Sequence, residues 1–287
     1  MGEIRPGDIV GRKSYGSDIL FRVERIYEIA NEKYALLRGL DMRLEADAPL
    51  WDLEVKEPIE ILEYKNRFLE KYRAKIRMAA ADREHQRRFL NFGDKEEKKM
   101  LFFEVPGRVI HIDGDKEYLN KCMRNYMQLN VDAVGFYVPE KEQPQRVKDI
   151  LLQHNAGILV LTGHDGLKKN AENILDLNNY RSSKYFVEAV KAARQLKPSR
   201  DDLIIFAGAC QSHFEAILEA GANFASSPKR VLIHAYDPVF VVEKIAYTYF
   251  DEVLNVEDVA KNSITGEDGI GGIETHGQFR WGYPKAT

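Results

Sequence analysis

The sequence predicts a doubly wound α/β domain, with a parallel sheet and helices on both faces, preceded by a smaller β-rich domain. From about residue 106 onward, strands that are apolar along their whole length alternate with amphipathic helices, which is typical of a parallel sheet covered on each side. Several of these strands run directly into small and polar residues, at the edge where such sheets place their sites. Before residue 57, β-branched and aromatic residues alternate with polar ones, which predicts short, half-buried strands.

The β-rich domain is expected to be a small SH3-like barrel that covers residues 1–57. Its strands are predicted at residues 8–12, 20–26, 34–40, 42–45 and 53–55. Gly7, Gly16 and Gly39 mark turns between them.

Residues 58–99 are expected to form a basic linking helix followed by a charged linker. Helical periodicity runs from residue 58 to about 92, and residues 93–99 are charged with no apolar side chain. Lysines and arginines between Lys65 and Arg88 alternate with acidic residues, so this face indicates a solvated helix surface more than a nucleic-acid surface. The α/β domain then takes residues 100–287.

Composition narrows the function classes. The 287 residues are 44% hydrophobic and carry a net charge of −3, which gives no global charge argument for nucleic acid or membrane as a partner. The two cysteines, Cys122 and Cys210, are too few for a disulfide framework and suggest a reducing compartment. No signal peptide or membrane span is visible, so synthesis in the cytoplasm is expected. The histidines show no ligand-like clustering, and neither a metal nor a cofactor is expected.

Within the α/β domain, the elements are predicted in strict alternation. The strands are expected at residues 107–112, 133–138, 157–161, 203–207, 223–225 and 231–235, and the helices at 116–129, 144–154, 183–196 and 211–220. Residues 266–277 form a glycine-rich loop to which we assign no role.

Two of these strands end in residues that can carry nucleophilic chemistry. The strand at 157–161 runs into His164, and the strand at 203–207 runs into Cys210. If the two strands are neighbours, both side chains lie at the same edge of the sheet. A thiol needs an adjacent imidazole to take its proton, so Cys210 is the candidate nucleophile and His164 the candidate general base. Cys210 is also expected to begin a helix, whose dipole lowers the thiol pKa.

The turn after His164 supplies candidates for the oxyanion hole. Backbone N–H groups of Gly163, Asp165 or Gly166 can stabilise a tetrahedral intermediate together with N–H groups at the Cys210 turn.

Four residues are candidates for substrate binding. Asp237 follows an apolar segment on the same edge and can pair with a substrate guanidinium, although it can equally begin the next helix before Pro238. Asp165 is a second candidate for that role or for orienting the histidine. Ser226 and Ser227 are candidates for contacts with the substrate backbone.

The remaining polar candidates have simpler interpretations. Asp113 and Asp115 end the first strand, where capping of the next helix is favoured over lining the cleft. His213 could compete as base, but a helical side chain is aimed less well than one at a strand end, so packing or a supporting hydrogen bond is favoured. Cys122 is expected in the core.

A family resemblance appears at these residues. The two apolar blocks that lead to His164 and to Ala209-Cys210 resemble the caspase-like peptidases. A closer and nearly chain-wide similarity is to the YabG family of sporulation peptidases, and it is carried by the segments GDIVGRKSYGSDILFRV, PGRVIHIDGD, TGHDG, LNNYRSSKYFVEAV, IFAGACQSHFEAILEAGANFASSP and GIGGIETHG.

The resemblance implies a caspase-like fold and a cysteine peptidase of endospore-forming bacteria. Its substrates would be spore coat and cortex-associated proteins, and itself, with cleavage after Arg, in the mother cell or forespore and at the coat. Two departures matter. Asp165 stands between His164 and the glycine at 166, which leaves the Gly166 N–H in doubt as an oxyanion donor. Gly208 stands where some Arg-specific relatives have an acid, so an acid that binds arginine must come from elsewhere.

Two other function classes compete with the peptidase. One is a nucleic-acid or polyanion binding module, in which the barrel and basic helix bind and the α/β domain is a scaffold. The other is a flavodoxin-like ligand binder that uses Asp113 and the glycine-rich loop. It ranks last because no G-x-G-x-x-G turn opens a helix after a strand.

Overall fold

The computed structural model describes residues 3–89, 102–169, 171 and 173–284, and it divides into two compact units. The first unit is Met1–Arg73 and the second is Ala74–Thr287. The division falls inside the long helix α1 (Pro58–Phe89). The expected linker at 93–99 lies outside the described residues.

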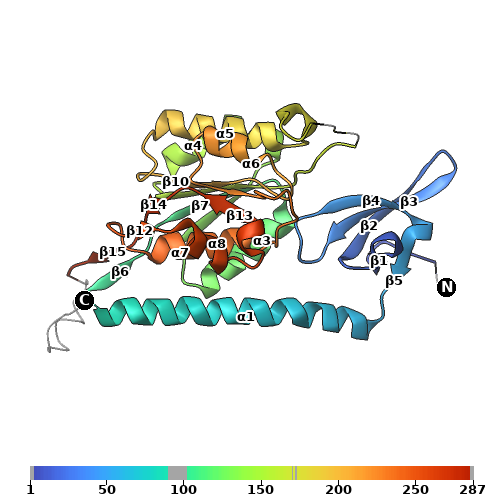
Figure 1. Ribbon diagram of the computed structural model, residues 1–287, viewed down its shortest axis with the longest axis horizontal. Helices are drawn as coiled ribbons and strands as arrows, with labels where there is room; N and C mark the ends of the chain where they lie inside the picture. Colours follow the sequence, from blue (N-terminus) through green and yellow to red (C-terminus); the bar gives the residue numbers. More distant parts are fainter. Residues whose placement is uncertain (1–2, 90–101, 170, 172, 285–287) are drawn as a thin grey trace. The chain divides into compact units, whose positions relative to one another are not determined.

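The first unit contains a five-stranded antiparallel sheet in the order β4-β3-β2-β1-β5 (Figure 1). Its inward side chains alternate along the strands and form one small core around Val10, Phe21, Val23 and Leu37. The prediction of a small antiparallel β domain is therefore confirmed at this level. The strands are β1 (Ile9–Arg12), β2 (Leu20–Ile29), β3 (Glu32–Gly39), β4 (Glu45–Pro49) and β5 (Leu53–Val55), with 3₁₀ turns η1 (Lys13–Tyr15) and η2 (Leu50–Asp52).

The prediction of a strand at residues 42–45 is wrong, because β4 begins only at Glu45. The chain makes a tight turn before it: Gly39 N–H donates to the Leu44 carbonyl, and Leu44 N–H donates to the Met42 carbonyl. A Cβ on Gly39 would lie 2.5 Å from the Met42 oxygen, so the turn requires glycine there.

The second unit is built on a six-stranded sheet in the order β13-β11-β10-β9-β7-β8. Five neighbouring strands are parallel, and β13 is added antiparallel to β11 at the edge. The predicted parallel sheet is confirmed. Its strands are β7 (Val109–Asp113), β8 (Ala133–Tyr137), β9 (Ile158–Thr162), β10 (Ile204–Ala207), β11 (Phe224–Ser226) and β13 (Ile270–Gly272).

Helices cover both faces of this sheet, as predicted. One face packs its apolar side chains against α4, α5 and α6, and α3 and α7 cover the other (Figure 1). None of the helices in the described residues is both long and apolar enough to span a membrane. The helices are α3 (Lys116–Gln128), α4 (Gln143–Gln153), α5 (Ser183–Leu196), α6 (Phe214–Glu219), α7 (Asp237–Tyr247) and α8 (Val256–Asn262), with 3₁₀ turns η3 (Glu140–Glu142), η4 (Leu177–Asn179) and η5 (Gly266–Asp268). Two small ribbons pair β6 (Phe103–Val105) with β15 (Arg280–Gly282) and β12 (Val253–Leu254) with β14 (Thr275–His276).

Three predictions around the sheet need correction. The helix expected from residue 211 begins only at Phe214, because Gln211 has a φ of 55° and the His213 side chain caps the first turn. The strand expected at 231–235 does not form. Part of the glycine-rich loop becomes β13, where Gly272 passes so close to β11 that a Cβ would lie 2.4 Å from the Asn223 carbonyl oxygen.

The part of α1 that belongs to the second unit is held on α7 by two ion pairs of different burial. Arg83 bonds the Glu243 carboxylate at 2.7 Å, and its guanidinium lies 3.4 Å from the Tyr247 ring centroid. The Glu243 side chain is 3% exposed. Lys244 bonds Asp82 at 2.8 Å, but that pair is largely solvated. Loss of the buried Arg83–Glu243 pair is therefore expected to lower the free energy of unfolding more than loss of the Lys244–Asp82 pair.

Replacing Arg83 by alanine is expected to lower the free energy of unfolding by about 3–5 kcal/mol, because it leaves a buried carboxylate without its cation. Burial raises the pKa of Glu243 above its ordinary value of 4.5, and Arg83 opposes this effect only in part. A raised pKa means that the folded state binds the proton more tightly, so stability is lost as the pH rises through that pKa. The deficit of Arg83→Ala should therefore be full at neutral pH and shrink as the pH falls toward 4.5.

Chemical denaturation across this pH range measures the effect. Lys244→Ala is the matched control on the same pair of helices, and it should cost at most about 1 kcal/mol. An equal loss in both variants, or a loss from Arg83→Ala that does not depend on pH, would contradict the assignment.

Candidate active site

The two strands that end in His164 and Cys210 are neighbours in the sheet. β9 and β10 pair in parallel, with Ile158 opposite Ile204 and Leu161 opposite Ala207. This register is an offset of 46 residues (204 − 158), which is also the separation of His164 from Cys210 (210 − 164). Each side chain therefore stands three residues beyond a paired position, at the carboxyl edge of adjacent strands whose spacing is about 5 Å.

A third residue lies in the same register on the other side of β9. β7 pairs with β9 so that Asp113 is opposite Thr162, and two residues further on Asp115 corresponds to His164. The His164 Nε2 atom is 2.8 Å from Asp115 Oδ2. The consecutive strands β7, β9 and β10 thus present a carboxylate, an imidazole and a thiol in order.

Asp115 has two roles at once. Its Oδ1 atom accepts the backbone N–H groups of Glu117 and Tyr118, which caps α3 as predicted. Its Oδ2 atom faces His164, which the capping interpretation alone missed. Because Nε2 is held by the carboxylate, Nδ1 is the ring nitrogen that Asp115 does not engage. Tyr118 packs against the imidazole edge, with ring centroids 5.7 Å apart.

Glu140 accepts a hydrogen bond from the backbone of His164, and this role was not predicted from the sequence. Its Oε1 atom accepts the His164 backbone N–H at 2.6 Å. Burial raises the pKa of Glu140, and the hydrogen bond from His164 lowers it by less. Gly114 and Gly163 leave the space for this carboxyl group, since a Cβ on either would lie within 2.3 Å of it. The only sequence signal was a glycine at both strand ends.

Cys210 lies in a loop that is bonded on both sides. Gly208 turns the chain with a φ of 112°, and a Cβ there would lie 2.5 Å from Ser226 Oγ. The Ala209 N–H donates to Ser212 Oγ, and Ser226 Oγ donates to the Ala209 carbonyl. The expectation that Cys210 begins a helix is wrong, because α6 starts four residues later and contains only six residues.

The Cys210 thiol is fully buried and is covered by a later segment of the chain. The Ile233 N–H donates to Sγ at 3.2 Å, and the Ile233 carbonyl lies 3.7 Å from the sulfur. The Gln211 N–H donates to the Val231 carbonyl at 3.1 Å. Hydrogen bonding by an N–H group favours the thiolate, whereas burial opposes it. Cys122 is also buried, as expected, and its Sγ lies 3.3 Å from the Ala235 carbonyl.

Asp165 clamps the histidine loop to the cysteine loop. Its Oδ1 atom accepts the N–H groups of Gly166 and Ser182, and its Oδ2 atom accepts the hydroxyls of Ser183 and Ser212. Burial raises the pKa of Asp165, while these four hydrogen bonds lower it. Both carboxylate oxygens are thus used internally, and the Gly166 N–H is directed at Asp165 in this conformation.

The other substrate-binding candidates also make internal bonds. Asp237, the first residue of α7, is fully buried and accepts the N–H groups of His234, Ile264 and Thr265. Burial raises its pKa. The Ser227 hydroxyl donates to the Val231 carbonyl and accepts from the Gln211 N–H, while Ser226 holds Ala209 as described above. In this conformation the described contacts of these residues are structural.

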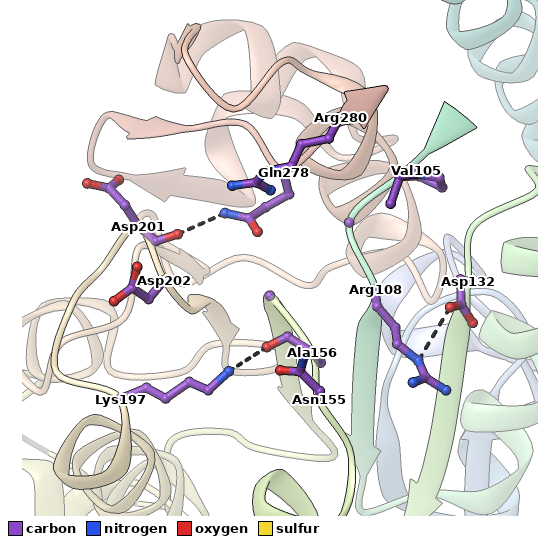
Figure 2. A pocket seen from close by; sticks show the side chains of 13 residues that line it. Val105, Arg108, Asp132, Asn155, Ala156, Lys197, Asp201, Asp202, Gln278 and Arg280 are labelled. Carbon is purple, nitrogen blue, oxygen red and sulfur yellow. Dashed lines mark hydrogen bonds and ion pairs between the residues drawn. The ribbon is translucent and has the colours of Figure 1, made fainter. Parts of the chain in front are cut away.

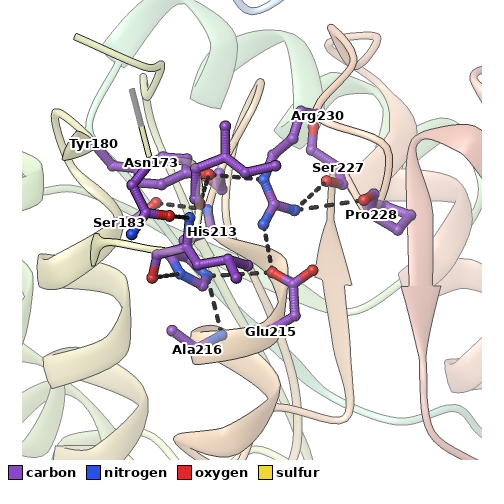
Figure 3. A network of polar contacts seen from close by, with 12 residues as sticks. Asn173, Tyr180, Ser183, His213, Glu215, Ala216, Ser227, Pro228 and Arg230 are labelled. Carbon is purple, nitrogen blue, oxygen red and sulfur yellow. Dashed lines mark hydrogen bonds and ion pairs between the residues drawn. The ribbon is translucent and has the colours of Figure 1, made fainter. Parts of the chain in front are cut away.

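The interpretation of His213 as a supporting residue agrees with its contacts. Its Nδ1 atom accepts the Ala216 N–H at 3.3 Å, and its Nε2 atom lies 3.0 Å from the Leu175 carbonyl (Figure 3). Its backbone N–H donates to Ser183 Oγ. Nδ1 therefore caps α6, while Nε2 bonds the cap to the segment that contains Leu175.

A cavity of about 510 Å³ lies at the opposite edge of the sheet (Figure 2). Its walls include Arg108 and Gly157, which precede β7 and β9, so it faces away from the strand ends that carry His164 and Cys210. Arg108 forms an ion pair with Asp132 at 3.3 Å, and the Lys197 ammonium donates to the Ala156 carbonyl. This cavity is therefore not part of the candidate site at His164 and Cys210.

Comparison with known proteins places the chain in a family. Residues 5–284 match the family described as YabG peptidase U57. The chain belongs to this peptidase family. It is 42% identical over 283 residues to the sporulation-specific protease YabG of Bacillus subtilis (strain 168), with 97% of each sequence covered. It is thus a peptidase of the sporulation type, and its substrates are proteins.

Among solved structures, the RcsB response regulator of Salmonella typhimurium covers 42% of this chain and 50% of its own, at 17% identity and a TM-score of 0.27. That likeness is too low to support any argument about fold or function.

Proposed function

We propose that this member of the YabG family is a cysteine endopeptidase in which Cys210 is the nucleophile, His164 the general base and Asp115 the residue that orients His164. The observation that carries the proposal is the common register of the three residues at the ends of β10, β9 and β7. A nucleophile, a base and an orienting acid in this order are the arrangement that nucleophilic acyl transfer requires.

In the first half of the reaction, His164 takes the thiol proton and the Cys210 sulfur attacks the scissile carbonyl carbon. The carbonyl oxygen becomes an oxyanion, for which we retain the N–H groups of Gly163 and Asp165 as proposed donors. The imidazolium then gives its proton to the departing amine, the C–N bond breaks, and the acyl group stays on sulfur as a thioester. Asp115 stabilises the imidazolium that forms between these steps.

In the second half, a water molecule attacks the thioester while His164 accepts its proton. The C–S bond breaks, the new carboxylic acid leaves and the thiol is restored.

The finer assignments follow from the family resemblance and are proposals as well. They comprise cleavage of spore coat and cortex-associated proteins, preference for Arg before the cut, self-cleavage, and association with the coat in the mother cell or forespore. We also propose a caspase-like fold for the domain at 100–287 and an SH3-like barrel at 1–57 that recruits a protein partner. The strand orders of the two sheets support these descriptions.

A mixed peptide library tests the proposed activity and its specificity. Incubation with the wild-type protein, followed by mass spectrometry, should show internal cuts with Arg before the scissile bond. The same library with Cys210→Ala should remain intact. Cuts confined to chain ends would contradict an endopeptidase, and cuts without basic residues would contradict the Arg preference.

A further inference from the structure

Residues 230–233, here called the covering segment, are hydrogen-bonded to the cysteine loop. The Val231 carbonyl accepts the Gln211 N–H and the Ser227 hydroxyl, and the Ile233 N–H reaches the Cys210 sulfur. The segment forms no strand of the sheet, although its apolar residues predicted one. Since the thiol is fully buried, a substrate cannot reach it while the segment is in place.

The side chain that begins this segment is held by a network of complementary polar contacts (Figure 3). The Arg230 guanidinium bonds the Glu215 carboxylate and donates through Nε to the Tyr180 hydroxyl at 2.8 Å. It also donates to the carbonyls of Ser227 and Pro228. Burial alone would raise the pKa of Glu215, but the hydrogen bond and charge of Arg230 outweigh it, so the pKa lies below its ordinary value.

The backbone of the segment shows that Arg230 is held there against a cost. Arg230 has a φ of 55°, in the left-handed region that non-glycine residues seldom adopt, and Ser227, just before the segment, has a φ of 62°. By contrast, the side chain of the neighbouring Lys229 is exposed and bonds the Asp268 carboxylate. Arg230 is therefore the basic side chain that holds this end of the segment, in addition to the backbone bonds of Val231 and Ile233.

We propose that the pocket formed by Glu215 and Tyr180 receives a basic side chain of the substrate, and that Arg230 occupies it here and keeps Cys210 covered. The inference rests on the proposed function of Cys210. It assigns a specificity-determining carboxylate, which neither Asp165 nor Asp237 can provide because both are bonded internally. It also makes the described conformation a latent state of the enzyme.

The register of the segment explains why it covers the thiol without being cut. A cleavable arginine would present its own carbonyl carbon to the sulfur. Here the sulfur contacts Ile233, three residues after Arg230, and the Val231 carbonyl is bonded to Gln211 and Ser227. A substrate with a basic side chain competes for Glu215, and once the Arg230 side chain leaves, only the backbone bonds of Val231 and Ile233 named above still hold the segment on the cysteine loop.

Alkylation of Cys210 tests the latent state without requiring catalysis. The wild type, Arg230→Ala, Arg230→Lys and Lys229→Ala are treated with iodoacetamide, and labelling of Cys210 and Cys122 is followed by peptide mass spectrometry. Arg230→Ala should label Cys210 at least about tenfold faster than wild type, which corresponds to losing roughly 1.4 kcal/mol of closure. Lys229→Ala and the labelling of Cys122 should not change, and Arg230→Lys should fall between wild type and Arg230→Ala.

The substrate role of Glu215 is tested by measuring the preference for Arg over Gln, with two peptides that differ only in the residue before the cut. Glu215→Gln should label Cys210 faster, as Arg230→Ala does, but should lose at least about tenfold of the preference for Arg over Gln, mainly through KM. Arg230→Ala should keep that preference and cleave faster than wild type.

Unchanged alkylation of Cys210 in folded Arg230→Ala, shown by an unaltered unfolding midpoint and an unchanged Cys122 rate, overturns the latent state. An intact Arg preference in Glu215→Gln overturns the pocket. If instead Cys210→Ala still cleaves peptides, the proposed function fails, and the alkylation result remains interpretable by itself.

Discussion

Replacing Cys210 by alanine is expected to lower kcat/KM for peptide cleavage by on the order of 10⁶-fold, to the level left by binding and oxyanion stabilisation alone. The substitution removes the atom that forms the thioester, and no other described side chain stands in register with His164 at the end of β10. Because the thiol is small and buried, alanine should fit the site with a modest loss of stability. Initial rates on a single internally cut peptide, measured with the unfolding midpoint, check both statements.

Cys122→Ala is the matched control for this experiment. Cys122 is an equally buried free cysteine of the same unit, with a carbonyl contact to its sulfur. It should leave the rate unchanged. A Cys210→Ala protein that cleaves within tenfold of wild type would remove Cys210 from the mechanism.

Asp115→Asn is expected to lower kcat by about 10²- to 10⁴-fold with little change in KM or in stability. Asparagine can still accept the N–H groups of Glu117 and Tyr118, so the cap of α3 should survive. It cannot supply the negative charge that stabilises the His164 imidazolium, and its amide can select the wrong imidazole tautomer. The loss should therefore appear in the chemical step.

Asp176→Asn provides the comparison, because Asp176 also caps a short helix, through the Asn178 N–H at 2.9 Å, with no described contact to His164. The pair of variants separates capping from catalysis. If both variants keep wild-type kcat, Asp115 only caps α3. If Asp115→Asn loses stability in proportion to activity, the loss is structural.

Sequence reasoning could place the thiol and the imidazole because both follow unbroken apolar strands. When two such strands pair in parallel, residues that stand the same number of positions beyond a paired position come to the same edge of the sheet, as His164 and Cys210 do. The same reasoning could have placed Asp115, which stands two residues beyond the end of β7, the other neighbour of β9 in the sheet. It did not, because an aspartate before a helix has a sufficient local explanation as a cap, and the structure shows that one carboxylate can serve both purposes.

What the sequence could not predict depends on contacts between distant segments. Helix α5 was predicted with its observed bounds, because Ser183 to Leu196 has a strong amphipathic period and local propensity decides it. Residues 231–235 carry the apolar pattern of a strand, but their hydrogen bonds go to the Cys210 loop. Glu140 was missed for the same reason, since its partner His164 lies 24 residues away and no periodicity links them.

In the proposed mechanism, Cys210 is the nucleophile of this peptidase and His164 activates it. The most direct measurement uses a peptidyl chloromethyl ketone with arginine next to the reactive carbon, with the adduct located by peptide mass spectrometry after a long incubation. We expect one adduct, in which the Cys210 sulfur has displaced chloride, and a rate of labelling that falls by at least about tenfold in His164→Ala. Labelling of Cys122 or of a serine instead, or labelling of Cys210 at the same rate without His164, would contradict it.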